Sequence, residues 1–229
     1  EVRAQVLAGA VTWDIVDLGL ADCATAEREG ILEPLDYDII SLEGFEEAAY
    51  SDAWAGTIYF TTVLAYNTEQ FGDNPPRTWA DFWDVENFPG ARSLRNNPVA
   101  TLEIALLADG VSKDELYPLD VERAFAKMEE IKPHIDVWWT SGAQSAQLLA
   151  DGEVDMISMG NGRIDALLEE GMPVAFTFNE GIAALDCLAI PKGAPNKDLA
   201  MQALAVMLAP EQQANIPQYI NYGPTTSLA

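Results

Sequence analysis

The sequence predicts a two-lobed α/β protein in which each lobe is a mostly parallel sheet covered by helices. The first observation is that short apolar strands alternate with helical patterns along all 229 residues, as in βαβ units. The second is that 49% of the residues are hydrophobic, so that the chain can fill a core in each lobe.

The third observation is a pair of turn-like segments, at which we expect the chain to cross between lobes. Pro75-Pro76 marks one crossing, and Asn179–Gly181 lies near the other. Two crossings make one lobe discontinuous. The predicted division assigns 1–68 with 186–229 to lobe 1 and 69–185 to lobe 2.

Elements of the first part of the chain follow from local pattern. Val11–Leu18 is an apolar run that favours a buried strand, and helical sequence follows it up to Gly30. Thr57–Asn67 is rich in Thr, aromatic and β-branched residues and predicts a strand. Thr78 can cap the helix that we expect over Trp79–Glu86.

The rest of the chain continues the alternation. A helix over Asp120–Ile131 is predicted from apolar Val121, Phe125, Met128 and Ile131, which recur at helical spacing. The other expected elements are strands at Ala91–Leu94, Val137–Trp139, Val154–Met159, Val174–Phe178 and Leu185–Ile190, and helices at Thr101–Asp109, Ser145–Gly152, Asn161–Glu170, Asn196–Leu208 and from Pro210.

Composition excludes some partners. The chain has 12 basic and 37 acidic residues, a net charge of −25. Nucleic acids and anionic membrane surfaces both require a basic face, so neither is an expected partner. No apolar run reaches the 18 residues that predict a transmembrane helix, and no signal peptide is present in this chain.

No catalytic or metal-binding set is visible. His134 is the only histidine, and we expect it on the surface after Pro133. The chain lacks G-x-S-x-G and a P-loop, and Gly160–Gly162 lacks the third glycine of a dinucleotide fingerprint. We therefore predict no enzyme, no metal and no cofactor, and keep an α/β transferase or hydrolase as the less favoured alternative.

The two cysteines, Cys23 and Cys187, are too few for a disulfide framework. We expect two buried thiols, with a bridge between them as the alternative.

Four loops at strand ends are the best candidates for a binding site. In open α/β sheets, ligands bind beyond the carboxyl ends of strands and at helix N-termini. The loops are Asp17–Asp22, Arg95–Pro98, Ser141–Gln144 and Gly160–Arg163. From them we select Asp22, Asn97, Ser141, Gln144, Asn161 and Arg163 as candidate ligand-binding residues.

A series of landmarks gives a family resemblance that runs in order through the whole chain. The landmarks are Trp13-Asp-Ile-Val-Asp, Tyr66-Asn67, Thr78-Trp-Ala-Asp-Phe-Trp, Phe88-Pro-Gly, Leu148-Leu-Ala-Asp-Gly-Glu-Val, Asn161-Gly-Arg, Leu188-Ala-Ile-Pro-Lys and Tyr222-Gly-Pro-Thr. With these landmarks the chain resembles the periplasmic solute-binding proteins of ABC importers, and most closely the spermidine/putrescine type.

The resemblance implies a type II binding-protein fold with the ligand cleft between its two lobes. It also implies secretion to the periplasm, hinge closure around a polyamine or other organic cation, and docking on a permease. We expect a monomer. It also implies a fragment that lacks the front strand–helix unit and the C-terminal helices of the family.

Ligand chemistry follows from the resemblance and from the residues. The resemblance implies that Asp186 anchors an ammonium group. From the residues themselves we select Tyr59 and Trp139 as aromatic contacts, with Trp138 as a further aromatic, and Tyr222 as another ligand-binding candidate. Arg95 and Arg163 stand beside the candidate loops, and arginine suits bidentate capture of a carboxylate. A carboxylate-bearing solute held by these arginines is therefore the alternative ligand.

Overall fold

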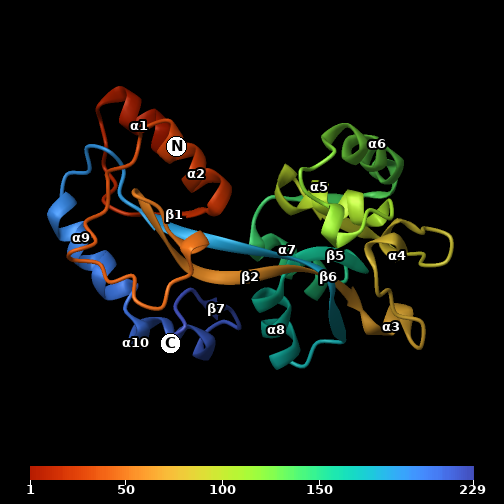
Figure 1. Ribbon diagram of the computed structural model, residues 1–229. Helices are drawn as coiled ribbons and strands as arrows, with labels where there is room; N and C mark the ends of the chain where they lie inside the picture. The colour runs from red at the N-terminus through yellow and green to blue at the C-terminus, as the bar shows by residue number, and fades with distance from the viewer. The chain divides into compact units, whose positions relative to one another are not determined.

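The computed structural model describes all 229 residues, which divide into two compact units. Unit 1 comprises Glu1–Phe60 with Ala184–Ala229, and unit 2 comprises Thr61–Ala183. Both changeovers fall inside long strands, β2 (Trp54–Asn67) and β6 (Val174–Ala189), drawn in orange and blue in Figure 1. The division expected from the sequence places these two changeovers later in the chain, at 68/69 and 185/186.

Strand β6 corrects one prediction, because the strands expected at Val174–Phe178 and Leu185–Ile190 are joined in one strand that runs without a turn from Val174 to Ala189. Its middle residue Glu180 has a positive φ of 57°. The backbone N–H of Trp79 donates to Glu180 Oε2 at 2.8 Å, and the Trp79 indole donates to the Glu180 carbonyl at 2.9 Å. These contacts hold the irregular residue within the strand, against the local turn signal.

In unit 1, strand β1 (Val16–Gly19) pairs antiparallel with β6, and β7 (Gly223–Pro224) pairs antiparallel with β2. The expected mostly parallel sheet is wrong for these pairs. The reason is that β6 enters unit 1 from unit 2, so no crossover helix within unit 1 fixes its direction. The helices of unit 1 are α1 (Val2–Ala8), α2 (Leu20–Arg28), α9 (Lys197–Met207) and α10 (Pro210–Gln213), with 3₁₀ turns η1 (Glu47–Ala49) and η4 (Ile216–Gln218).

A disulfide between Cys23 and Cys187 joins α2 to β6, so the expectation of two free thiols is wrong. Both cysteines are fully buried and are 164 positions apart in the sequence. They lie in a hydrophobic core that includes Val16, Trp54 and Leu185. Pairing over such a distance depends on the packing of unit 1, which spacing alone does not reveal.

In unit 2, β3 (Arg92–Arg95) lies between β4 (Val137–Trp139) and β5 (Met156–Gly160), and all three strands are parallel. β5 also pairs antiparallel with the second half of β2. The helices of unit 2 are α3 (Thr68–Phe71), α4 (Trp79–Trp83), α5 (Pro98–Ala108), α6 (Val121–Ile131), α7 (Gly142–Ala150) and α8 (Asn161–Glu169), with 3₁₀ turns η2 (Lys113–Glu115) and η3 (Lys132–His134).

Two predicted helices, α4 and α6, are present in unit 2. Thr78 caps α4 in a capping box with Asp81, as the sequence predicts. In α6 the buried face contains Ala124, Met128 and Ile131, whereas Val121 is 46% exposed and Phe125 is 55% exposed. Those two lie at the edge of the apolar face, and the helix itself is confirmed, with Asp120 as its N-cap. No helix in the chain combines the length and the apolar character needed to cross a membrane.

Candidate functional site

The carboxyl ends of the three parallel strands of unit 2 meet at one edge of the sheet, and a helix begins just beyond each. We call this the strand-end edge, made of 95–97, 139–144 and 160–163. Helices α7 and α8 pack against β5 and against each other. Three of the four predicted loops therefore gather in one place, where helix N-termini favour an anion.

Arg95 is held over an aromatic ring at this edge. Its guanidinium carbon lies 5.5 Å from the ring centre of Trp139, within cation–π range. Trp139 is buried and its indole donates to the Ser158 carbonyl at 2.9 Å. The Asn96 N–H donates to the Trp139 carbonyl at 2.8 Å. Trp139 is thus a fixed support for the arginine.

Arg163 lies against the turn that begins α7. A methyl group added to Gly142 would be 3.2 Å from Arg163 Nε, so glycine leaves the room that the guanidinium occupies. The Ser141 hydroxyl accepts from the Gln144 N–H at 3.2 Å, and Gln144 Oε1 accepts from the Thr140 N–H at 2.9 Å. Ser141 and Gln144 therefore build the turn; their direct contact with a ligand stays a prediction.

The charge at the edge contrasts with the rest of the protein. Neither Arg95 nor Arg163 takes part in an ion pair, although the net charge is −25. Arg163 is exposed and Arg95 is half-buried. Two guanidinium groups without a carboxylate partner, beside helix N-termini, suit the binding of an anionic group.

The start of α5 completes the edge. Asn97 Oδ1 accepts from the Val99 N–H at 2.9 Å, which caps the helix. Ala100 is buried with a φ of 65°, a conformation that L-residues rarely adopt. The Thr101 hydroxyl donates to the Arg95 carbonyl at 3.2 Å. This irregular segment fixes the loop after β3, and strained backbone of this kind is frequent at functional sites.

Asn161 supports the edge from within. It is 7% exposed, and its Oδ1 accepts from the Thr61 N–H at 2.9 Å. Thr61 lies 100 positions earlier in the sequence, so no sequence signal could have linked the two residues.

Two candidate acids lie in unit 1. Asp22 is exposed in the first turn of α2. Asp186 is half-buried on β6 opposite Gly19, with its Oδ1 3.8 Å from the position of a Gly19 Cβ. Each of these acids is the sequence neighbour of a bridged cysteine, so the disulfide links their two segments.

Two candidate tyrosines also lie in unit 1. The Tyr59 hydroxyl is 3.5 Å from Glu46 Oε2, and burial followed by the Glu46 charge raises the pKa of Tyr59. The Tyr222 ring packs 5.6 Å from the ring of Phe60. The role of both tyrosines in binding stays a prediction.

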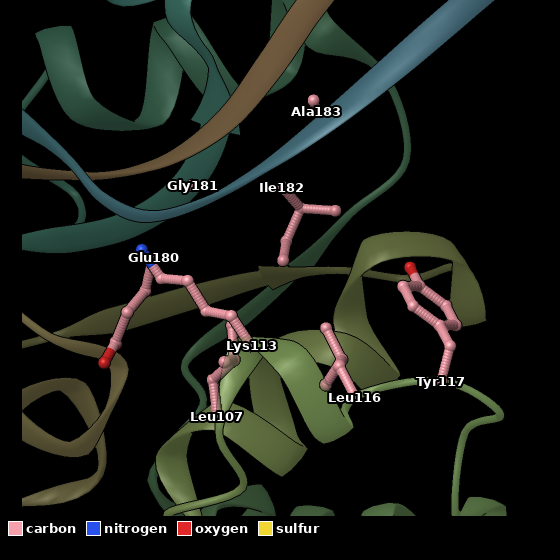
Figure 2. A pocket seen from close by; sticks show the side chains of 8 residues that line it. All are labelled: Leu107, Lys113, Leu116, Tyr117, Glu180, Gly181, Ile182 and Ala183. Atoms are coloured by element: carbon pink, nitrogen blue, oxygen red, sulfur yellow. The ribbon is translucent and has the colours of Figure 1, made fainter.

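A separate pocket of about 200 Å³ lies in unit 2, and Figure 2 shows its lining. Tyr117, opposite Glu180 in this view, donates to Glu103 at 3.1 Å. Burial and the Glu103 charge raise the pKa of Tyr117 to about 12. The pocket contains no predicted site residue, and its lining is Leu107, Lys113, Leu116, Tyr117, Glu180, Gly181, Ile182 and Ala183.

The side chains that most often act in catalysis or metal binding are not gathered at a second site. His134 is exposed, as expected. No three side chains among histidine, cysteine, aspartate and glutamate gather where they could hold a metal ion.

The fold and the strand-end edge define an α/β binding protein of the periplasmic type. The model of the family described as "Bacterial extracellular solute-binding protein" matches residues 1–229, and the chain belongs to this family. Its relatives are solute-binding proteins and not enzymes.

Two curated relatives differ in the ligand named. The chain is 38% identical to a gamma-aminobutyric acid-binding protein of Pseudomonas aeruginosa, over 98% of this chain and 65% of the relative. It is 26% identical to the spermidine/putrescine-binding periplasmic protein of Escherichia coli K12, over 75% of this chain and 49% of the relative. The chain thus spans about half to two thirds of these proteins.

Solved structures of binding proteins share the fold. An ABC transporter substrate-binding protein from Bradyrhizobium japonicum is 50% identical, with a TM-score of 0.92 over 99% of this chain and 71% of the other. The PBP MotA from A. tumefaciens B6, solved with glucopine, is 40% identical, with a TM-score of 0.95 over 99% of this chain and 72% of MotA. AgtB from A. tumefaciens R10, solved with agropinic acid, is 32% identical, with a TM-score of 0.92 over 98% of this chain and 70% of AgtB.

Proposed function

We propose that this chain is the substrate-binding component of a periplasmic ABC importer and that its solute is a small organic acid of the amino-acid type. The observation that carries the proposal is the pair of arginines at the strand-end edge, Arg95 on its tryptophan and Arg163 beside Gly142, neither in an ion pair. The permease partner, the monomeric state and capture by hinge closure stay predictions.

Charge separates this proposal from the polyamine suggested by the sequence resemblance. The charged groups of a polyamine are all ammonium groups, which the guanidinium groups of Arg95 and Arg163 would repel. A carboxylate accepts two parallel hydrogen bonds from one guanidinium, which adds both strength and orientation. The names of two similar proteins point the same way, because gamma-aminobutyric acid and agropinic acid are both acids.

Replacing Arg163 tests the proposal. We expect Arg163→Ala to weaken the binding of gamma-aminobutyric acid by about 1.5–3 kcal/mol, the usual scale for a hydrogen bond to a charged group. Isothermal titration calorimetry with this acid, with butyrate and with putrescine measures the effect.

The control is Arg28→Ala, which makes the same charge change on an exposed arginine that bonds Ala24 and Thr25 of its own helix. It should leave affinity unchanged. Putrescine binding that is indifferent to Arg163→Ala, with no binding of either acid, would contradict the proposal and restore the polyamine.

A second variant tests recognition of the amino group. If Asp186 pairs with an ammonium group, Asp186→Asn should weaken the binding of gamma-aminobutyric acid by about 1.5–3 kcal/mol. Butyrate has the same carboxylate and no amino group, so its affinity should not fall. Equal losses for both ligands would show that Asp186 acts on the fold and not on the amino group.

A further inference from the structure

Asn161 lies where the strand-end edge meets the first crossing between the two units. It is the first residue of α8, two positions before Arg163, and is 7% exposed. Its Oδ1 accepts from the N–H of Thr61 at 2.9 Å. Thr61 is the first residue of unit 2 and follows Phe60 directly within β2.

The second crossing touches the same threonine. A methyl group added to Gly181 would be 2.6 Å from Thr61 Cγ2, so β6 packs closely on Thr61 at Gly181, two residues before unit 2 ends at Ala183. The neighbouring Glu180 is held by two hydrogen bonds from Trp79. Contacts therefore run without a gap from α8 through β2 to β6.

We propose that Asn161 is a positioning residue that transmits occupancy of the strand-end edge to the backbone of both crossings. This inference rests on the proposed function, because it requires a carboxylate at Arg163 and the first turn of α8. A bound anion orders that turn through its N–H groups and the arginine. The hydrogen bond between the Thr61 N–H and Asn161 Oδ1 restricts the motion of Thr61 in turn. The close packing of Thr61 on Gly181 then restricts the backbone of β6.

Amide hydrogen exchange at single-residue resolution tests the inference. In the wild-type protein, saturating gamma-aminobutyric acid should slow exchange at Thr61 and at 180–183 at least tenfold. In Asn161→Ala, exchange at Thr61 should be faster even without ligand, the ligand response at both crossings should disappear, and the Kd should rise about tenfold. Asn161→Asp keeps the Oδ1 acceptor and should restore the protection of Thr61 in the free protein.

The matched control is Asn67→Ala at the other end of the same strand. Asn67 Oδ1 accepts from the Glu69 N–H at 2.9 Å, so the variant also removes a hydrogen bond from a backbone N–H to an asparagine Oδ1, here the cap of α3. It should leave the ligand response at Thr61 and at 180–183 as in the wild type. Thermal unfolding of each variant separates loss of fold from loss of coupling.

Two results would overturn the inference, and only the second of them would also overturn the proposed function. If wild-type protein binds the acid and Asn161→Ala keeps the exchange response at both crossings, the inference fails while the proposed function stands. If calorimetry detects no carboxylate binding to the wild-type protein, the proposed function fails and the inference fails with it.

Discussion

Reduction of the Cys23–Cys187 disulfide should lower the free energy of unfolding by about 2–5 kcal/mol. The bridge closes a loop with a sequence separation of 164, so it removes much of the freedom of the unfolded chain. It also joins the front segment of unit 1 to its tail across a shared core. Urea denaturation followed by far-UV circular dichroism, with and without dithiothreitol, measures the change.

A double variant, Cys23→Ala with Cys187→Ala, provides the control. It should be destabilised by a similar amount and should show no further response to dithiothreitol. Both cysteines are fully buried, so reduction requires opening of unit 1 and should be slow. An unfolding midpoint that is the same in the oxidised, reduced and double-variant proteins would contradict the prediction.

Replacing Arg92 by methionine should cost at least about 3 kcal/mol of stability, because each buried acceptor that loses its partner costs about 1–3 kcal/mol. Arg92 is 2% exposed and donates to the carbonyls of Phe82, Asp84, Phe88 and Gly90. Burial lowers the pKa of Arg92, but its side chain stays charged at neutral pH. Methionine fills a similar space and supplies none of these donors.

The comparison for Arg92 is Arg123→Met. Arg123 is an arginine whose side chain is 46% exposed and which pairs with Asp109 at 2.6 Å on the surface. Exposed pairs of this kind contribute about 0–1 kcal/mol, so this variant should lose less than about 1 kcal/mol in the same denaturation experiment. Equal effects of the two substitutions would show that the carbonyls around Arg92 find other partners.

The position of Arg92 links stability to the site. It is the first residue of β3, and Arg95 is the last. The loop that Arg92 organises therefore leads directly into the strand that presents Arg95 to the strand-end edge. A partial loss of order at Arg92 should weaken ligand binding as well as stability.

Much of the candidate site could be predicted because its signals are local. The polar residues Asn97, Ser141 and Arg163 each follow a strand and precede or begin a helix, and the structure places them at one edge of a parallel sheet. Parallel strands bring their carboxyl ends together wherever helices connect them, so the grouping follows from the order of elements. The choice of ligand does not follow, because it depends on which charges remain unpaired after folding.

The sequence by itself determined the alternation of strands and helices, the lack of a recognisable catalytic motif and the three loops that lie at the strand-end edge. Periodicity and capping act within a few residues, and these features need nothing more. Only the tertiary structure decided the Cys23–Cys187 bridge, the continuity of β6 through Glu180 and the bond from Thr61 to Asn161. Each of these joins or depends on residues about 100 or more positions apart, whose approach is set by packing of the folded chain and not by local preference.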